Sequence, residues 1–208
     1  MWSFFHISRV VLFSVVLCFV MVGPSQAQLR SLFNLFASEY HGSVIRGSNF
    51  GQALIAVDES GQEFRFEDFK GKISLVFFGF TLCPDVCPTT LAQLSRLKTE
   101  LTEEESEQVQ VYFITVDPER DTPLRLKEYL NYFDPSFKGL IANTEQLAVI
   151  AKSFNIFYNK VPLEMNHYTM EHSSYIFVLD KKADSVLLFR DSMSVEEMLN
   201  DIRRLLVK

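Results

Sequence analysis

The chain has 208 residues, of which 48% are hydrophobic and 22% are charged. This composition excludes a disordered tail protein, a collagen-like fibre and a disulfide-stapled mini-protein, and it is sufficient for a buried core. With 20 basic against 26 acidic residues, the formal net charge is −6. Such a charge provides no basic surface for a polyanion, so we expect no nucleic-acid partner. The chain has three cysteines, Cys18, Cys83 and Cys87.

The first 27 residues have the composition of an export signal. Arg9 precedes the apolar run 10–22, which fits the roughly 7–15 apolar residues of a secretory signal better than the roughly 17–25 of a membrane span. Ser25 and Ala27 form a small-x-small cleavage pattern, so we predict cleavage after Ala27. An uncleaved membrane anchor within residues 1–27 is the alternative. Export would place the mature chain in an oxidising compartment, where two cysteines can form a disulfide, a redox couple or a metal site.

The mature chain has the length of one domain. Residues 28–50 show no sustained periodicity, and we predict a terminal extension there, followed by a domain over residues 51–208. A β-hairpin opens this domain, with strands at 53–58 and 63–66. The near-continuous apolar run 73–80 is typical of a strand that is covered on both faces.

Helical and strand patterns then alternate along the chain. Residues 88–101 place leucines at helical spacing and predict an amphipathic helix with Pro88 at its first position. Residues 158–171 carry few signals and predict a mobile loop. The remaining predicted elements are strand 109–116, helix 123–133 after the N-cap Thr122, strand 140–142, helix 145–154 after the N-cap Thr144, strands 173–179 and 185–189, and helix 194–206 with the capping box Ser194 and Glu197. This order implies an α/β fold with a mixed central sheet and helices on both faces.

Cys83 and Cys87 lie in the connection between the predicted central strand and the helix that follows it. The positive end of a helix stabilises a thiolate, so we expect these cysteines to be acidic and nucleophilic. The connection also follows the carboxyl end of a parallel strand, where open α/β sheets place their chemistry. Three interpretations stay open here: a structural disulfide, a dithiol oxidoreductase and a site for a soft metal ion.

A metal site at these cysteines needs a third ligand, because two thiolates complete neither a zinc tetrahedron nor an iron–sulfur cluster. Imidazole is the obvious candidate. His41 lies in the predicted extension and His167 in the predicted loop, whereas His172 directly precedes an apolar strand. A strand next to the central one would bring His172 close to the cysteines.

Three segments together resemble the Sco/SenC family of copper chaperones. They are residues 78–88, F-G-F-T-L-C-P-D-V-C-P, residues 117–122, D-P-E-R-D-T, and His172 before a strand. The resemblance extends over roughly residues 45–206. It implies a thioredoxin-like three-layer α/β/α sandwich with an N-terminal hairpin, and copper, as Cu(I) or Cu(II), held by Cys83, Cys87 and His172.

The resemblance also implies a function and a location. Family members deliver copper to the copper site of a respiratory cytochrome c oxidase subunit, or reduce its thiols. The implied partners are that copper-accepting subunit, another copper chaperone or a thioredoxin-like reductant. Since family members are usually anchored in a bacterial or mitochondrial inner membrane, we predict a periplasmic or other extracytoplasmic protein, with inner-membrane anchoring as an option.

Other residues near the implied site have candidate roles. Asp85 is predicted to shape the turn or tune the thiolates. Asp117, Glu119 and Arg120 are predicted either to build the loop before the next helix or to support the ligands and dock a partner. A copper-relay role is also conceivable for the soft donors of the loop, which are Met165, His167 and Met170. If the loop is mobile, it could open as a lid and release the metal.

Two enzymatic alternatives accompany the metallochaperone. The first is a thiol-disulfide oxidoreductase in which Cys83 attacks and Cys87 resolves. The second is a thiol peroxidase, because a Phe-x-x-Cys-Pro segment ahead of a helix also resembles peroxiredoxins. His172 discriminates among these functions, since the metal site requires it and the enzymes do not.

Overall fold

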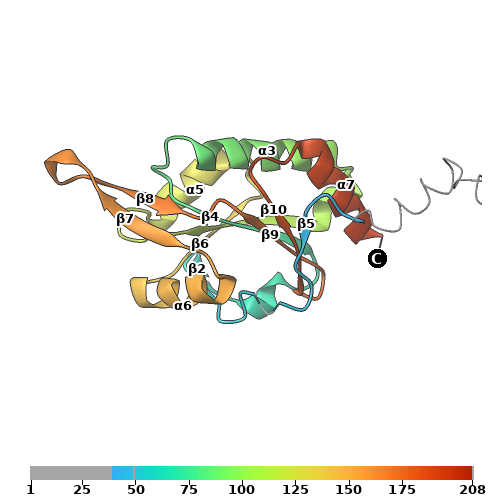
Figure 1. Ribbon diagram of the computed structural model, residues 1–208, viewed down its shortest axis with the longest axis horizontal. Helices are drawn as coiled ribbons and strands as arrows, with labels where there is room; N and C mark the ends of the chain where they lie inside the picture. Colours follow the sequence, from blue (N-terminus) through green and yellow to red (C-terminus); the bar gives the residue numbers. More distant parts are fainter. Residues whose placement is uncertain (1–38, 49, 208) are drawn as a thin grey trace, which may run out of the picture. The chain divides into compact units, whose positions relative to one another are not determined.

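An eight-stranded mixed sheet forms the centre of the computed structural model, which describes residues 39–48 and 50–207 (Figure 1). Its strand order is β1-β10-β9-β4-β5-β6-β2-β3. The strands are β1 (Ser43–Val44), β2 (Ile55–Asp58), β3 (Glu63–Arg65), β4 (Ile73–Gly79), β5 (Val109–Thr115), β6 (Lys138–Ile141), β9 (Ile176–Leu179) and β10 (Ser185–Phe189). Strands β4, β5 and β6 are parallel, whereas β9 runs antiparallel to β4. The predicted mixed sheet is therefore confirmed.

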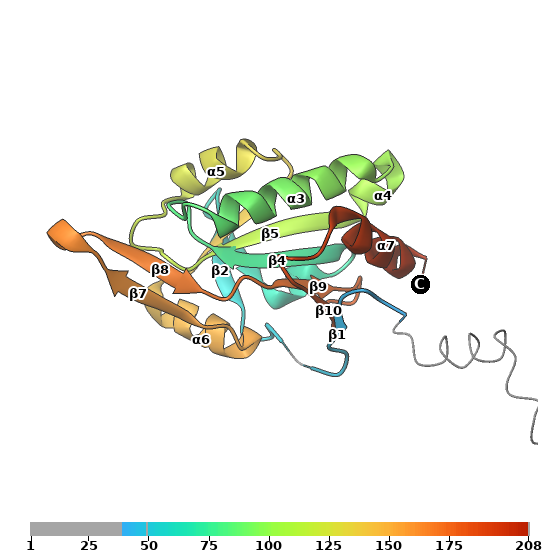
Figure 2. The ribbon, with the colours of Figure 1, turned by 45° about the horizontal axis from the view of Figure 1, so that its top comes forward.

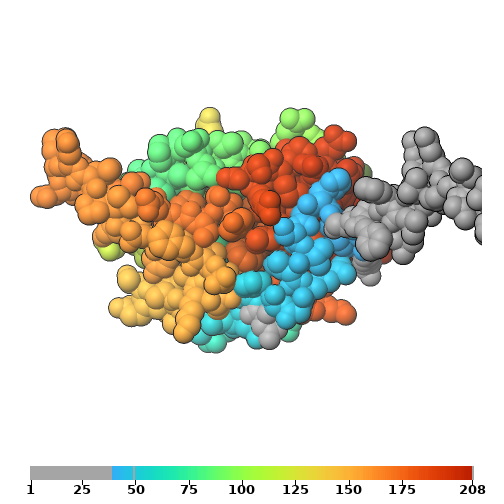
Figure 3. All heavy atoms as spheres, viewed as in Figure 1, coloured from blue at the N-terminus to red at the C-terminus, as the bar shows by residue number. Residues whose placement is uncertain are grey.

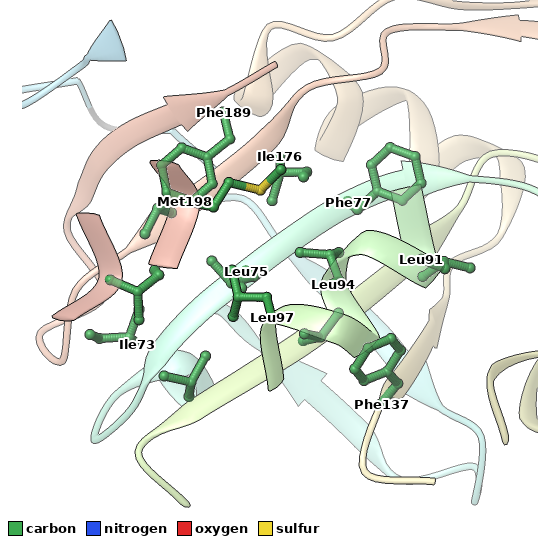
Figure 4. Packing of buried hydrophobic residues seen from close by; sticks show 14 of the residues in the cluster. Ile73, Leu75, Phe77, Leu91, Leu94, Leu97, Phe137, Ile176, Phe189 and Met198 are labelled. Carbon is green, nitrogen blue, oxygen red and sulfur yellow. The ribbon is translucent and has the colours of Figure 1, made fainter. Parts of the chain in front are cut away.

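Helices cover both faces of this sheet (Figure 2). They are α3 (Val86–Glu100), α4 (Glu103–Glu107), α5 (Pro123–Asn131), α6 (Thr144–Phe154) and α7 (Val195–Leu206), with a short 3-10 helix at Phe66–Phe69. Every residue of β4 is buried, as its apolar sequence predicted. Successive side chains of a strand point to opposite faces, so β4 contributes to two separate cores. Leu75 and Phe77 pack with leucines of α3 (Figure 4), while Val76 and Phe78 pack on the side of α6.

The predicted N-caps agree with the structure for two helices and differ by one residue for a third. Thr122 caps α5 ahead of Pro123, and Ser194 with Glu197 forms the predicted capping box of α7. The N-cap of α6 is Asn143, one residue before the predicted Thr144.

The start of α3 also differs from the prediction. This helix begins at Val86, two residues before Pro88, so Cys87 lies inside its first turn. A proline is tolerated there because the N–H groups of the first turn have no partner within the helix.

Part of the predicted extension belongs to the sheet. The compact unit begins at Tyr40, and β1 pairs with the edge of β10. The buried carboxylate of Asp201 in α7 accepts hydrogen bonds from the backbone N–H groups of His41 and Gly42, at 3.0 and 2.8 Å. Figure 3 shows these first described residues, in blue, lying against the red C-terminal part of the chain.

The predicted export signal, its cleavage site and the alternative anchor lie outside the described residues. Within the described part of the chain, no helix has the length and apolar character needed to cross a membrane.

The segment predicted as a mobile loop is a β-hairpin, so that prediction was wrong. Strand β7 (Tyr158–Pro162) pairs antiparallel with β8 (Tyr168–His172), and the two form a separate sheet that projects from the body (Figures 1 and 2). A short 3-10 turn, Glu164–Asn166, joins them. The residues of both strands are half-buried or exposed, so the strands lack the apolar alternation that marks a strand with one buried face. His172 is consequently the last residue of β8, and the apolar strand after it starts only at Ile176.

Candidate metal centre

Three side chains from separate parts of the fold converge at the carboxyl end of β4. The ligand atoms of Cys83, Cys87 and His172 all lie within 4.8 Å of one another. The Sγ atom of Cys87 is 3.4 Å from Nε2 of His172, although 85 positions separate these residues. Both cysteines are free thiols, Cys87 buried and Cys83 partly exposed. The arrangement therefore has one sheltered and one accessible sulfur.

The two cysteines are placed by the end of β4 and the start of α3. The backbone N–H of Cys83 donates to the carbonyl oxygen of Phe80, which closes the turn after the strand. Cys87 follows in the first turn of α3 and packs on Gly79. A Cβ atom at Gly79 would lie 2.7 Å from Cys87 Sγ, so only glycine permits this approach.

The electrostatics of the pair are asymmetric. The Cys87 thiol donates a hydrogen bond to the sulfur of Cys83, and this bond is the largest cause that lowers the pKa of Cys83 to about 4. His172 and the backbone N–H groups of Asp85 and Cys87 lower it further, against the opposing effect of burial. The same sulfur–sulfur hydrogen bond, together with burial, raises the pKa of Cys87. Cys83 is thus the thiolate of the apo-protein, and Cys87 is its neutral partner.

His172 is oriented by its other ring nitrogen. Its Nδ1 lies 3.0 Å from the carbonyl oxygen of Ser173, and since a carbonyl can only accept, Nδ1 carries the proton. Nε2, the other ring nitrogen, then faces the sulfur of Cys87 at 3.4 Å. The rings of Phe77 and Phe80 contact the imidazole edge-to-face, with centroids at 6.2 and 5.9 Å. Both phenylalanines are fully buried and keep water from one side of the site.

The donor set determines which metal the site suits. Two thiolate sulfurs and one imidazole nitrogen are soft or borderline donors, which suit Cu(I) in three-coordinate geometry. A structural zinc site needs a fourth protein ligand. Among the described residues, no additional histidine, cysteine or acidic side chain joins this group. The residues present therefore fit a single Cu(I) ion.

The segment 117–122 supports the cysteine turn from behind. The carboxylate of Asp121 is buried and accepts hydrogen bonds from the backbone N–H and hydroxyl of Thr81, at 3.1 and 2.5 Å, and from the hydroxyl of Thr115 at 2.6 Å. This network ties the residue two positions before Cys83 to the end of β5. Asp121 is a functional residue that the sequence did not single out, because Thr81 and Thr115 lie 40 and 6 positions away from it along the chain.

The other acidic and basic candidates lie in different environments. Asp85 is exposed, and its side chain makes no capping hydrogen bond to α3. Asp117 is buried and binds the guanidinium of Arg120 at 2.5 Å. Glu119 is exposed and pairs with Lys160 of β7 at 2.7 Å. Asp117, Glu119 and Arg120 therefore all contact one another or the hairpin, and none of them joins the three ligands.

The soft donors of the hairpin do not cluster at the ligands. Met165 is 86% exposed in the turn of the hairpin, and His167 follows it, also exposed. Met170 packs on the hydrophobic core from the middle of β8. A strand rises about 3.3 Å per residue, so the turn lies roughly 13 Å or more from His172.

Known proteins resemble this chain in sequence and in fold. The family model described as SCO1/SenC matches residues 43–207. The chain belongs to this family. An SCO2-like protein of Rickettsia conorii is 36% identical over 149 residues, which cover 71% of this chain and 72% of the relative.

Solved structures of the family have the same fold. Copper-bound ScoI of Bradyrhizobium japonicum has a TM-score of 0.68 and 34% identity, covering 79% of this chain and 98% of that one. The structure of BsSco, a member of the Sco family of cytochrome c oxidase assembly proteins, has a TM-score of 0.60 and 20% identity, covering 79% and 96%. At that identity, BsSco supports the fold alone. The predicted thioredoxin-like α/β fold is confirmed.

Proposed function

We propose that this protein is an extracytoplasmic copper carrier that binds one Cu(I) ion through Cys83, Cys87 and His172 and delivers it to the copper site of a respiratory cytochrome c oxidase. The convergence of the three ligand atoms within 4.8 Å carries the proposal. Membership of the SCO1/SenC family, which has a copper-bound member at 34% identity to this chain, supports it.

The electrostatics of the site suit a metal carrier. Cys83 is already a thiolate in the apo-protein, so it can capture a cation without first losing a proton. Cys87 is buried beside it, and the buried ring of Phe80 packs on the imidazole of His172. An ion bound by all three ligands would still have an open side toward partly exposed Cys83, where an acceptor's thiolate could attack it.

The proposal is tested by anaerobic competition titration of the full-length chain with Cu(I). We expect the parent to bind one equivalent tightly, and Cys83→Ser, Cys87→Ser and His172→Ala each to weaken binding by several orders of magnitude. His167→Ala is the matched control, because His167 lies on the same hairpin but outside the cluster. Binding by His172→Ala that equals the parent's would contradict the three-ligand site.

Delivery to the oxidase needs its own measurement. Copper-loaded protein is mixed with a soluble copper-accepting domain of an oxidase subunit, and metal transfer is followed by the visible spectrum of the acceptor. We expect transfer from the copper-loaded parent and none from the apo-protein. Failure of the loaded parent to transfer would contradict the delivery role while leaving copper binding intact.

A second function is favoured by the unequal pKa values of the two cysteines. The Cys83 thiolate would attack a partner's disulfide, forming a mixed disulfide and releasing one partner thiol. Cys87 would then attack the sulfur of Cys83, releasing the second partner thiol and leaving a Cys83–Cys87 disulfide. The partner gains two electrons, and an external thiol reductant must restore the protein. His172→Ala separates the two functions, because it removes a copper ligand and spares both sulfurs of the reductase.

A further inference from the structure

We propose that Tyr168, held by Asp117 and Arg120, is the positioning residue that places His172 in the metal site. This inference rests on the proposed copper site and extends it to the element that carries the histidine. The contacts among Asp117, Arg120 and Tyr168 are called the Tyr168 anchor below. None of these three residues touches the metal ligands' donor atoms in the described structure.

The need for an anchor follows from the topology. Both cysteines belong to the body of the protein, where the sheet and α3 fix them. His172 instead ends β8, whose only strand partner among the described residues is β7. Within this part of the chain, no hydrogen-bonded ladder ties the hairpin to the main sheet. At the hairpin base, Ser173 and Phe157 exchange hydrogen bonds at 2.9 and 3.0 Å, which close the hairpin on itself without fixing its direction. Contacts between side chains must therefore hold the hairpin in place.

Tyr168 makes several such contacts at the end of β8 farthest from His172. Its hydroxyl donates to Oδ1 of Asp117 at 2.9 Å, and its carbonyl oxygen accepts from Nη1 of Arg120 at 2.8 Å. The guanidinium of Arg120 also lies over the tyrosine ring, 3.7 Å from the centroid, and Lys160 lies at 4.0 Å. Because Arg120 also pairs with buried Asp117, the tyrosine binds a group that is itself fixed.

The geometry of β8 connects the anchor with the ligand. Tyr168, Met170 and His172 alternate along one strand, so their side chains leave the same face. Tyr168 is held at the far end, Met170 packs on the core in the middle, and His172 reaches the cysteines at the near end. Fixing the far end restricts rotation of the whole strand about its base.

A second path runs through Phe80. The guanidinium of Arg120 lies 5.9 Å from the centroid of the Phe80 ring, and that ring meets the imidazole of His172 at 5.9 Å. Arg120 therefore contacts both the tyrosine that holds the strand and the phenylalanine that packs on the ligand. Its loss would loosen both.

Loss of the Tyr168 anchor should weaken copper binding, because His172 would then lie at the metal site in a smaller fraction of the molecules. If the hairpin places His172 at the site only part of the time, the apparent dissociation constant rises by the inverse of that fraction. Groups that orient a metal ligand without touching the metal contribute roughly 10- to 100-fold in affinity. We expect Tyr168→Ala to weaken Cu(I) binding within this range.

The test is a double-mutant cycle on the full-length protein, measured by Cu(I) competition titration. Tyr168→Ala should weaken binding in the parent and have no further effect in a His172→Ala background, because the anchor acts through that ligand. Tyr168→Phe keeps the ring over Arg120 and should lose less than 10-fold. Thr169→Ala is the matched control, since Thr169 is the next residue of β8 and points to the opposite face.

The outcomes separate this inference from the proposed function. If His172→Ala binds copper as the parent does, the proposed site fails and the anchor fails with it. If His172→Ala is weak but Tyr168→Ala binds like the parent, the anchor alone is refuted. Equal weakening by Tyr168→Ala in both backgrounds would also overturn it, because the effect would not pass through His172. Should Tyr168→Ala fail to fold, Asp117→Asn, which removes the charge that holds Arg120, takes its place in the same cycle.

Discussion

Gly79 lies directly against the sulfur of Cys87, and a Cβ atom there would sit 2.7 Å from that sulfur and 2.8 Å from the ring of Phe113. The last residue of the central strand is thus small because a ligand and an aromatic ring share its space. The end of β4 and the metal site therefore pack directly against each other.

Gly79→Ala should damage both stability and metal binding. Overpacking a filled core costs about 1–3 kcal/mol, and the displaced atom here is a copper ligand. We expect the free energy of unfolding in urea to fall by this amount and Cu(I) affinity to fall at least about 10-fold.

Gly139→Ala separates the two effects. A Cβ atom at Gly139 would lie 2.5 Å from the side chain of Leu126, so it overpacks the same face of the sheet two strands away from the cysteines. It should lose similar stability and keep its copper affinity. Equal loss of affinity in both variants would mean that Gly79 acts through stability only.

Cys83 should react with iodoacetamide at a pH where ordinary cysteines do not. The thiolate is the nucleophile, and the hydrogen bond from Cys87 lowers the pKa of Cys83, so the thiolate persists as the pH falls below neutral. Mass spectrometry of the reduced apo-protein alkylated between pH 5 and 9 should show modification of Cys83 already at the acidic end. Cys87, whose pKa is raised, should stay unmodified.

The Cys87→Ala variant identifies the cause of that reactivity. It removes the largest contribution that lowers the pKa of Cys83, so the alkylation profile should shift toward the ordinary thiol value of about 8.5. An unchanged profile would show that the helix start and its backbone N–H groups suffice without the second cysteine.

Copper affinity should depend on pH with the slope of one thiol. Metal binding requires both sulfurs as thiolates, but only Cys87 carries a proton to lose near neutral pH, because Cys83 is already ionised. Between pH 7 and 8, the Cu(I) binding constant should therefore rise about 10-fold per pH unit, as competition titrations can measure. A slope near 100-fold would mean that both thiols are protonated in the apo-protein.

Asp121→Ala should lower the free energy of unfolding, because it removes the hydrogen bonds that support the cysteine turn. Its buried carboxylate accepts from half-buried Thr81 and buried Thr115, and its removal leaves those donors without this partner, at a cost of about 1–3 kcal/mol. Urea unfolding measures the loss. Asp134→Ala is the control, because Asp134 accepts one backbone N–H from Ser136 in an exposed turn and should change stability by no more than about 0.5 kcal/mol.

Local patterns in the sequence were enough for the layers of the fold. The apolar run of β4 and the leucine spacing of α3 report burial directly, since each element must bury a face of fixed periodicity. The spacing of Cys83 and Cys87 across a strand–helix connection likewise placed both sulfurs at a helix start. Each of these features depends only on residues that lie close together in the sequence.

The family resemblance named His172 as the third ligand, but only the tertiary structure shows how it joins the cysteines. His172 reaches Cys87 because the next strand, β9, runs antiparallel beside β4. No local sequence pattern predicts which two strands of a sheet will be neighbours. The sequence did not predict the hairpin that carries His172, because its half-buried and exposed strands lack an apolar alternation. It did not predict the Tyr168 anchor either, because those contacts span about fifty residues. Sequence periodicity predicts which face of each helix or strand is buried. A site made from side chains that are distant in the sequence depends instead on which helices and strands become neighbours in the folded sheet.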